Sequence, residues 1–262
     1  MKIKTKNNVE LNKMRAAGLL AAKVLDFITP LVKPGVTTNY LNDMCAKFTL
    51  ENGAISAPLN YRGFPKSICT SPNEVVCHGI PNDEKLKEGD IINLDITVIL
   101  DGFHGDTSRM FYVGEVSDEA KKLVETTYKA MMAGIETIKS GSKLTDIGWA
   151  IQNLVQPHGY GIVRDYCGHG IGREFHTDPM VIHYGVKDKN YDMKLKKGMT
   201  FTVEPMINIG TFVTELMTDD NWTVKTADRK LSAQFEHTIA VTDNGVEILT
   251  ASPAGYTCPP YV

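Results

Sequence analysis

The chain has 262 residues, of which 42% are hydrophobic and 23% charged, and its formal net charge is −3 at pH 7. This length is enough for a full hydrophobic core, either in one large domain or in two fused halves, and the slightly acidic balance argues against a nucleic-acid-binding surface. Its 5 cysteines lack paired CxxC spacing and favour a reducing cytoplasm, and no apolar run approaches the ~20 residues of a membrane span.

Two helices are predicted in the first part of the chain. Apolar residues recur at helical spacing over residues 9–29. A second periodic segment follows Gly35 and stops at Gly53, and glycine is common just past a helix end. A pair of amphipathic helices is therefore expected here.

A strand and a hairpin are predicted next. After Gly89 apolar and polar residues alternate strictly, which predicts a strand whose polar face carries Asp95. Asp101-Gly102 is a strong signal for a two-residue hairpin. This turn pairs Asp106 with Thr97, on the same face as Asp95, so the two carboxylates become diagonal neighbours that can share an ion.

The second half of the chain repeats this order of elements. Helical spacing covers residues 118–138, after Ser117 as a plausible N-cap, and a second helix is closed by Gly159. An alternating strand follows Gly198 and leads to Glu204 on its polar face. Helix, helix and acid-bearing strand thus occur twice.

The two halves carry an acid at equivalent places. Each acid follows a Leu-Lys-x-Gly string at the same spacing, Asp95 in the first half and Glu204 in the second. We interpret residues 1–262 as a single domain with an internal duplication, roughly 9–113 and 117–250. The predicted fold class is α+β, with two pseudo-twofold-related halves and a shared site at their seam.

Two further side chains extend this set of potential metal ligands. Glu236 lies on the polar face of a strand predicted over residues 231–241, and His169 stands between glycines that allow close backbone approach. One imidazole with four carboxylates is a hard, oxygen-rich set suited to Mn, Fe, Co or Zn. Because four carboxylates carry twice the charge of one divalent ion, two ions are expected.

The motifs around these residues resemble those of type I methionine aminopeptidases. The resemblance runs from the first helix to about Ala251. It implies the pita-bread fold of the creatinase/aminopeptidase group, and removal of the initiator methionine from nascent chains when the second residue is small. The spacing leaves no room for the helical insertion of type II relatives. The sequence also begins at the catalytic domain, without the N-terminal zinc-binding extension of eukaryotic type I forms, so the resemblance implies a bacterial-style minimal catalytic domain. The matching strings are Pro65-Lys66-Ser67-Ile68-Cys69, Asn73-Glu74-Val75-Val76-Cys77-His78-Gly79-Ile80-Pro81, Gly168-His169-Gly170-Ile171-Gly172 and Thr202-Val203-Glu204-Pro205.

The resemblance also implies how the ligands divide between two divalent ions. Asp106 and Glu236 would bridge both ions. Asp95 would hold one ion, and His169 and Glu204 would hold the other. Co, Mn, Fe, Zn and Ni are all compatible with such a set, so the sequence leaves the working metal open.

Catalytic roles follow from the same resemblance. It places His78 near the scissile amide nitrogen and His176 near the carbonyl oxygen, where an imidazole would stabilise the tetrahedral oxyanion. Glu204 would carry a proton from water to the leaving amine.

A pocket for the methionine side chain is implied as well. Its walls would be largely aromatic, which suits a thioether sulfur. Pro58 and Phe64 differ from the cysteine and tyrosine that many relatives place there, so the pocket differs in detail at these positions. The implied walls are Tyr61, Phe64, Cys69, Phe175 and Trp222.

Further expectations concern a monovalent cation and the partners of the protein. Backbone carbonyls of Asn73, Val75 and Ser232 would bind Na or K, by resemblance. The expected partners are nascent polypeptide N-termini, with transient ribosome association, no nucleic acid and no membrane. We expect a cytoplasmic monomer.

Plainer interpretations remain for single residues and for the whole chain. An isolated acid on a strand is usually solvated, and His78 or His176 alone could be an ordinary structural histidine. A proline-specific peptidase of the same fold and a metal-free binding module are the alternatives for the chain. Solvent-exposed or packing roles are expected for the other histidines, with His237 buried on the strand face opposite Glu236; these are His104, His158, His183 and His237.

Overall fold

The computed structural model describes residues 3–188 and 191–261, and within them the main sheet has nine strands. Its order is β1-β4-β5-β14-β9-β7-β8, with β2 beside β4 and β15 beside β14. The strands are β1 (Ile55–Ser56), β2 (Cys69–Pro72), β4 (Ile91–Leu100), β5 (Phe103–Tyr112), β7 (Gly168–Gly170), β8 (Thr177–Val181), β9 (Thr200–Val203), β14 (Glu236–Val241) and β15 (Val246–Ile248).

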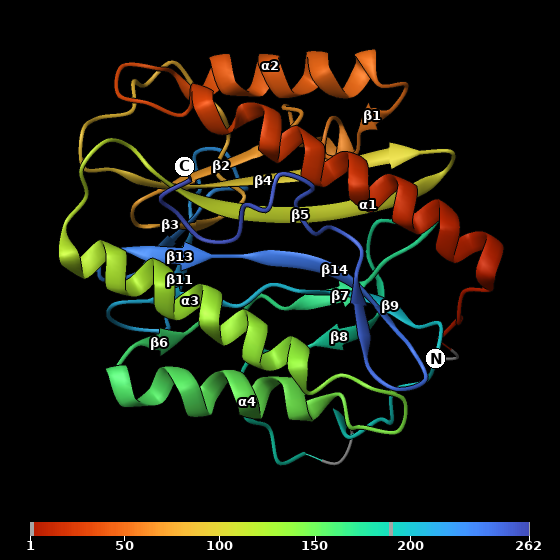
Figure 1. The fold of residues 1–262 in the computed structure, drawn as a ribbon. Helices are drawn as coiled ribbons and strands as arrows, with labels where there is room; N and C mark the ends of the chain where they lie inside the picture. The colour runs from red at the N-terminus through yellow and green to blue at the C-terminus, as the bar shows by residue number, and fades with distance from the viewer. Residues whose placement is uncertain (1–2, 189–190, 262) are drawn as a thin grey trace.

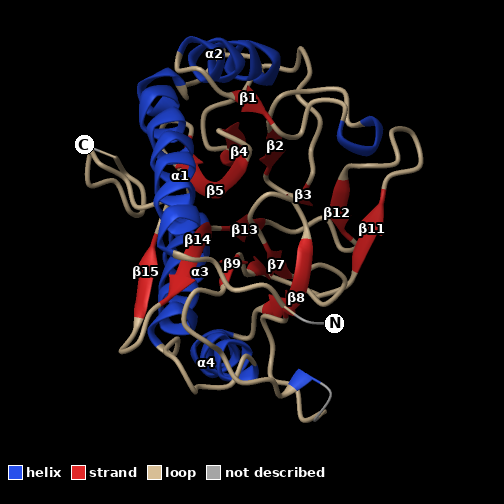
Figure 2. Ribbon diagram, turned by 90° about the vertical axis from the view of Figure 1, so that its right-hand side faces the viewer, coloured by secondary structure: helices blue, strands red, loops and turns tan. Residues whose placement is uncertain are grey.

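Two small three-stranded sheets flank the main sheet within the described residues. One has the order β13-β10-β6 and the other β11-β12-β3. Figure 2 shows β11 and β12 beside β3, on the side of the molecule away from α1 and α3. The strands are β3 (Val75–Cys77), β6 (Gly161–Ile162), β10 (Met206–Asn208), β11 (Thr214–Leu216), β12 (Val224–Thr226) and β13 (Ser232–Gln234).

The predicted helix pairs are confirmed. Side-chain caps start three of the four α-helices of the described chain: Asn7 forms a capping box with Glu10, and Thr37 and Ser117 each accept a backbone N–H of the first turn. The α-helices are α1 (Asn8–Ile28), α2 (Thr38–Glu51), α3 (Asp118–Glu136) and α4 (Thr145–Val155), and short 3₁₀ turns cover Thr29–Leu31, Tyr61–Gly63 and Gln156–His158.

Each helix pair covers its own part of the main sheet, and the two parts meet where β14 lies beside β5 (Figure 1). Residues of α1 and α2 pack with β4, and residues of α3 and α4 pack with β9 and β14. At Gly105 a Cβ would lie 2.4 Å from the backbone of Ala17, so glycine is needed for α1 to lie directly on β5. Burial of these apolar faces holds the helices against the sheet.

Equivalent glycines shape the entry to the acid-bearing strand in each half. Gly89 donates its N–H to Val113 O at 2.9 Å, and Gly198 donates to Val241 O at 2.9 Å. Both glycines have positive φ, +93° and +82°, a conformation that L side chains rarely adopt. The same backbone device thus occurs in both halves.

Two strand predictions are wrong in detail. The strand predicted over residues 231–241 is broken at Phe235 into β13 and β14, which belong to different sheets. Glu204 follows the end of β9 instead of lying within the strand. Pro205 has no N–H to continue the ladder, so the strand ends before it.

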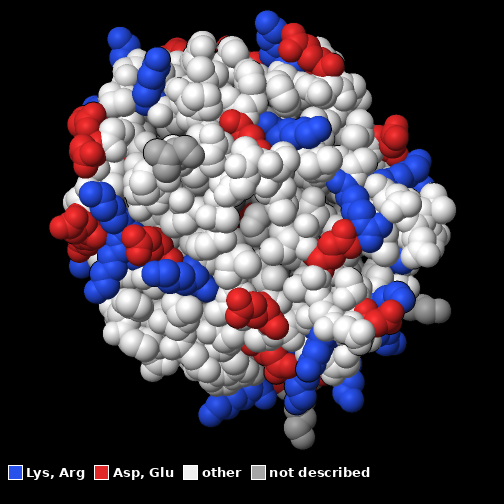
Figure 3. All heavy atoms as spheres, in the orientation of Figure 1, with Lys and Arg blue, Asp and Glu red and all other residues white. Residues whose placement is uncertain are grey.

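Among the described residues, no helix is long and apolar enough to cross a membrane. All 5 cysteines are free thiols. On the face drawn in Figure 3, basic and acidic side chains are interspersed and neither sign forms a continuous patch. This face therefore offers no extended basic surface of the kind that binds nucleic acid.

Candidate metal centre

The β4–β5 hairpin places the first two acids as the sequence predicts. Asp101 and Gly102 both have positive φ, 50° and 75°, which suits a tight two-residue turn. Thr97 pairs with Asp106 in the register, and its Oγ1 donates to Asp106 Oδ1 at 2.7 Å. Asp95 lies on the same strand face, two residues from Thr97.

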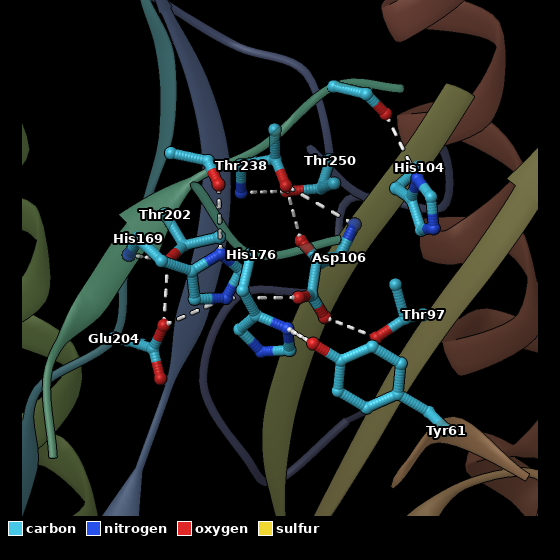
Figure 4. A network of polar contacts seen from close by, with 12 residues as sticks. Tyr61, Thr97, His104, Asp106, His169, His176, Thr202, Glu204, Thr238 and Thr250 are labelled. Atoms are coloured by element: carbon cyan, nitrogen blue, oxygen red, sulfur yellow. Dashed lines mark hydrogen bonds and ion pairs between the residues drawn. The ribbon is translucent and has the colours of Figure 1, made fainter. Parts of the chain in front are cut away.

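His169 reaches this hairpin from β7. Its Nε2 lies 3.6 Å from Asp106 Oδ2 and 3.7 Å from Glu204 Oε1. A Cβ at Gly168 or Gly170 would lie 2.4 or 2.0 Å from a backbone oxygen of a neighbouring strand, so only glycine allows this approach. Figure 4 shows His169 between Asp106 and Glu204, with a contact to each.

Glu236 joins the cluster because β14 lies beside β5. Glu236 pairs with Ser108 on β5, the residue that also pairs with Asp95 on β4. Asp106, His169 and Glu236 each offer a ligand atom, and these atoms lie within 4.8 Å of one another. Three predicted ligands therefore already form a compact group, with two more acids at its edge.

The electrostatics of the cluster favour a bound cation. Burial, followed by the nearby charges of Asp106 and Glu204, raises the pKa of Asp95 well above its usual value, and burial does the same for Glu236. Burial also raises the pKa of Glu204 to about 7. Asp95 Oδ1 and Glu236 Oε1 are buried without a hydrogen-bond partner. Orphaned carboxylate oxygens and one imidazole are the donors that hard divalent ions accept, so the residues present fit a metal centre.

Glu204 is held by three neighbours. Thr202 Oγ1 donates to its Oε1 at 2.6 Å, and Gln234 Nε2 lies 3.3 Å from its Oε2. Its backbone N–H, which has no strand partner, donates to His183 Nε2 at 3.0 Å. Burial lowers the pKa of His183 to about 3, so the ring is neutral and can accept this bond. We predicted only a solvent-exposed or packing role for His183, but its ring contacts the backbone of Glu204.

A cavity of about 340 Å³ opens beside the acids. All five predicted ligands line it, and so do both predicted catalytic histidines and Pro58. Asp165 and Tyr166 also line it and were not expected from the sequence, because no spacing pattern marks them. The predicted pocket walls are all present in the lining: Tyr61, Phe64, Cys69, Phe175 and Trp222.

The aromatic walls pack mainly edge to face or tilted. Phe64 and Trp222 are T-shaped at 5.2 Å between ring centroids, and Tyr61 and Phe175 are tilted at 4.9 Å. Such a lining presents π-faces and edges to an apolar side chain, and sulfur makes favourable contacts with both.

Both catalytic candidates are neutral imidazoles. Burial lowers the pKa of His78 to about 4, and burial with the neighbouring His169 lowers the pKa of His176 to about 3. His78 adopts a left-handed backbone conformation, φ 56°, a kind of strain that often occurs at functional sites. His176 Nδ1 lies 3.0 Å from Tyr61 Oη. For His169, burial alone would lower the pKa, but the contacts with Asp106 and Glu204 raise it overall.

The predicted monovalent-cation residues lie outside the cavity lining. Asn73 has positive φ, 52°, and its carbonyl accepts the N–H of Ser232 at 2.9 Å. Val75 is buried in β3, and Ser232 Oγ is buried without a hydrogen-bond partner. Asn73 and Ser232 are thus in direct contact.

The other histidines make structural contacts. His104 Nδ1 lies 3.0 Å from Gly172 O, and its ring stacks on Phe175. His237 Nδ1 lies 2.9 Å from Thr250 Oγ1, consistent with the predicted packing role. His158 stacks on Tyr160.

Comparisons with known proteins agree with this geometry. A model of metallopeptidase family M24 matches residues 12–243. The chain is 59% identical to a methionine aminopeptidase of Rickettsia prowazekii over 261 residues, or 100% of both chains. It is 54% identical to a methionine aminopeptidase of Escherichia coli strain K12 over 252 residues, which cover 95% of this chain and 94% of the other.

Solved structures show the same relationship. The crystal structure of the Rickettsia prowazekii methionine aminopeptidase matches with a TM-score of 0.93 at 60% identity, covering 95% of this chain and 100% of that one. A prolidase from Pyrococcus furiosus matches with a TM-score of 0.74 at 21% identity, covering 94% of this chain and 65% of that one. At that identity the prolidase shows a shared fold only.

Proposed function

The chain belongs to the methionine aminopeptidases of metallopeptidase family M24, and we propose that its cavity removes the initiator methionine from nascent chains whose second residue is small. It is a hydrolase with the pita-bread α+β fold that the sequence predicts. The observation that carries the proposal is the convergence of Asp106, His169 and Glu236 beside an aromatic cavity.

We propose that two divalent ions bind in this cluster. Asp106 and Glu236 would bridge the ions, Asp95 would hold one of them, and His169 and Glu204 the other. Bound there, the ions would lower the pKa of water and polarise the scissile carbonyl. The unpartnered oxygens of Asp95 and Glu236 support these assignments, since metal ligation would satisfy them.

Three side chains would act on the peptide itself. Glu204, which a bound ion would keep in its charged form, would accept a proton from water and deliver it to the leaving amine. His78 would lie at the scissile nitrogen. His176 would donate an N–H to the carbonyl oxygen as negative charge develops there.

The aromatic lining would select methionine. The proposed walls, with Cys69 at one side, surround an apolar space that suits the unbranched methionine side chain. With methionine in this pocket, the scissile bond would lie at the acids. Resemblance to the family adds the requirement for a small second residue, because a long side chain there would shift the carbonyl away from the acids.

Further assignments follow from the same proposal. Residues 1–262 would form one catalytic domain with duplicated halves, as the equivalent contacts of Gly89 and Gly198 support. Asn73, Val75 and Ser232 would bind Na or K. The protein would act in the cytoplasm, where its free thiols remain reduced, as a monomer that associates transiently with ribosomes.

Turnover of a Met-Ala-Ser peptide tests this function. The purified protein, supplied with Mn or Co, should release free methionine, measured by mass spectrometry. The matched control is the N-acetylated peptide, which should remain intact because its α-amine is blocked. Cleavage of Ala-Pro-Ser without cleavage of Met-Ala-Ser would favour the proline-specific alternative, and no turnover with any metal would favour a binding module.

A further inference from the structure

The turn that joins β11 to β12 carries one wall of the cavity. Met217 and Thr223 close this turn, because the N–H of Met217 donates to Thr223 O at 2.8 Å. Asn221 has positive φ, 58°, which asparagine tolerates better than most residues. Trp222 comes next and lines the cavity. In Figure 2 this hairpin projects beyond β3 and away from α1 and α3.

Asp220 organises the turn with its side chain. Its Oδ1 accepts the N–H groups of both Trp222 and Thr223 at 2.8 Å, and its Oδ2 accepts the hydroxyl of Thr223 at 2.6 Å. Three donors therefore converge on one carboxylate. These bonds lower the pKa of Asp220 although its partial burial acts in the opposite direction, so the group is ionised at neutral pH. Hydrogen bonds to an ionised acceptor are stronger than neutral ones.

Trp222 in turn contacts both functions of the cavity. Its ring is T-shaped against Phe64 at 5.2 Å and against His78 at 6.1 Å. The hairpin also joins the strand that precedes His78, because Val224 on β12 pairs with Cys77 on β3. A shift of Trp222 would therefore change the pocket wall and the surroundings of His78.

We propose that Asp220 is a positioning and specificity-determining residue that fixes the Trp222 indole as the wall of the methionine pocket. The proposal rests on the function assigned above. Asp220 would act at a distance from the acids, through the backbone N–H groups of Trp222 and Thr223 and the hydroxyl of Thr223. Its neighbour Asp219 is exposed and offers a matched charge one residue away.

Kinetics of three variants test the proposal. Asp220→Ala should raise KM for Met-Ala-Ser by about 10-fold, roughly the worth of one charge-assisted hydrogen bond. It should also lower the preference for methionine, measured as kcat/KM for Met-Ala-Ser divided by kcat/KM for Leu-Ala-Ser. Asp220→Asn keeps an oxygen for the two N–H groups and should restore most of both values. Asp219→Ala, which removes the same charge, should behave as the wild type.

Fluorescence gives a readout that does not depend on turnover. The chain has 2 tryptophans, so a Trp149→Phe background leaves Trp222 as the single reporter. Adding Asp220→Ala should lower the emission anisotropy of Trp222 and shift its emission to longer wavelength, because the indole gains mobility and contact with water. Asp220→Asn and Asp219→Ala should leave both values unchanged.

The outcomes separate this proposal from the proposed function. If the wild type does not release methionine, the function fails, whereas the fluorescence test still reports on the turn. If the wild type is active and Asp220→Ala keeps its KM, its selectivity and its Trp222 emission, the positioning role is wrong. A fall in kcat alone, with KM and selectivity unchanged, would indicate a loss of folded enzyme and would also overturn the proposal.

Discussion

At the scale of single residues, the centre contains acids that burial makes costly to ionise. The raised pKa values of Asp95, Glu204 and Glu236 all have burial as their main cause. A bound cation offsets that cost, because it favours the charged form of each carboxylate. Such perturbed groups in one cavity are typical of an active site.

Asp106 is the residue whose loss should be most damaging. It contacts His169 and Thr97 and belongs to the compact ligand group. Asp106→Asn keeps the shape but removes the charge, so we expect loss of bound metal together with a fall in activity of roughly 100-fold or more. Elemental analysis and Met-Ala-Ser turnover measure the two effects. A variant that keeps two metals and near-normal activity would refute the bridging assignment.

His78 and His176 should behave differently from the ligands. Each is neutral and lines the cavity, and we assign neither of them to the metals. Alanine at either position should lower kcat on the order of 10²-fold because transition-state stabilisation is lost. Metal content, measured in parallel, should stay at the wild-type level. Loss of metal from these variants would instead identify them as ligands.

At the scale of elements, hydrophobic periodicity and turn motifs correctly predicted those helices and strand pairs that depend on local sequence. The bounds of α1 and α3 and the Thr97–Asp106 register follow from spacing and from the Asp101-Gly102 turn. The contact between His183 and Glu204 could not be predicted in this way, because it depends on where β9 ends and which loop packs there. The break at Phe235 could not be predicted either, because the chain passes there from one sheet to another while the alternation of apolar and polar residues continues.

Gly105 offers a test of how α1 supports the hairpin. Its missing Cβ would lie 2.4 Å from the backbone of Ala17, so Gly105→Ala should push α1 away from β5. We expect a loss of about 1–3 kcal/mol in the free energy of unfolding, typical of overpacking, with weaker metal binding by the adjacent Asp106. Denaturant unfolding of the metal-free protein measures the first effect. Gly245→Ala, where no atom lies within 4 Å, is the control and should be near neutral.

At the scale of the whole molecule, the site lies where the two parts of the sheet meet. β5 and β14 are neighbours in the main sheet, and β5 supplies Asp106 and β14 supplies Glu236. Neither half alone contains the full ligand set. The repeated acids in the sequence indicated this arrangement, whereas the aromatic cavity walls come from irregular segments and from the β11–β12 turn, where no periodic pattern marks them.

The arrangement of cavity and acids leads to a prediction about the second residue of substrates. The methionine pocket and the acids fix the scissile carbonyl between them, and a displacement of about 1 Å can cost ~10²-fold in rate. Met-Ala-Ser and Met-Ser-Ser should therefore be cut far faster than Met-Lys-Ser. Rates on the peptide series check this statement. Efficient cleavage of Met-Lys-Ser would mean that the cavity accepts long second side chains.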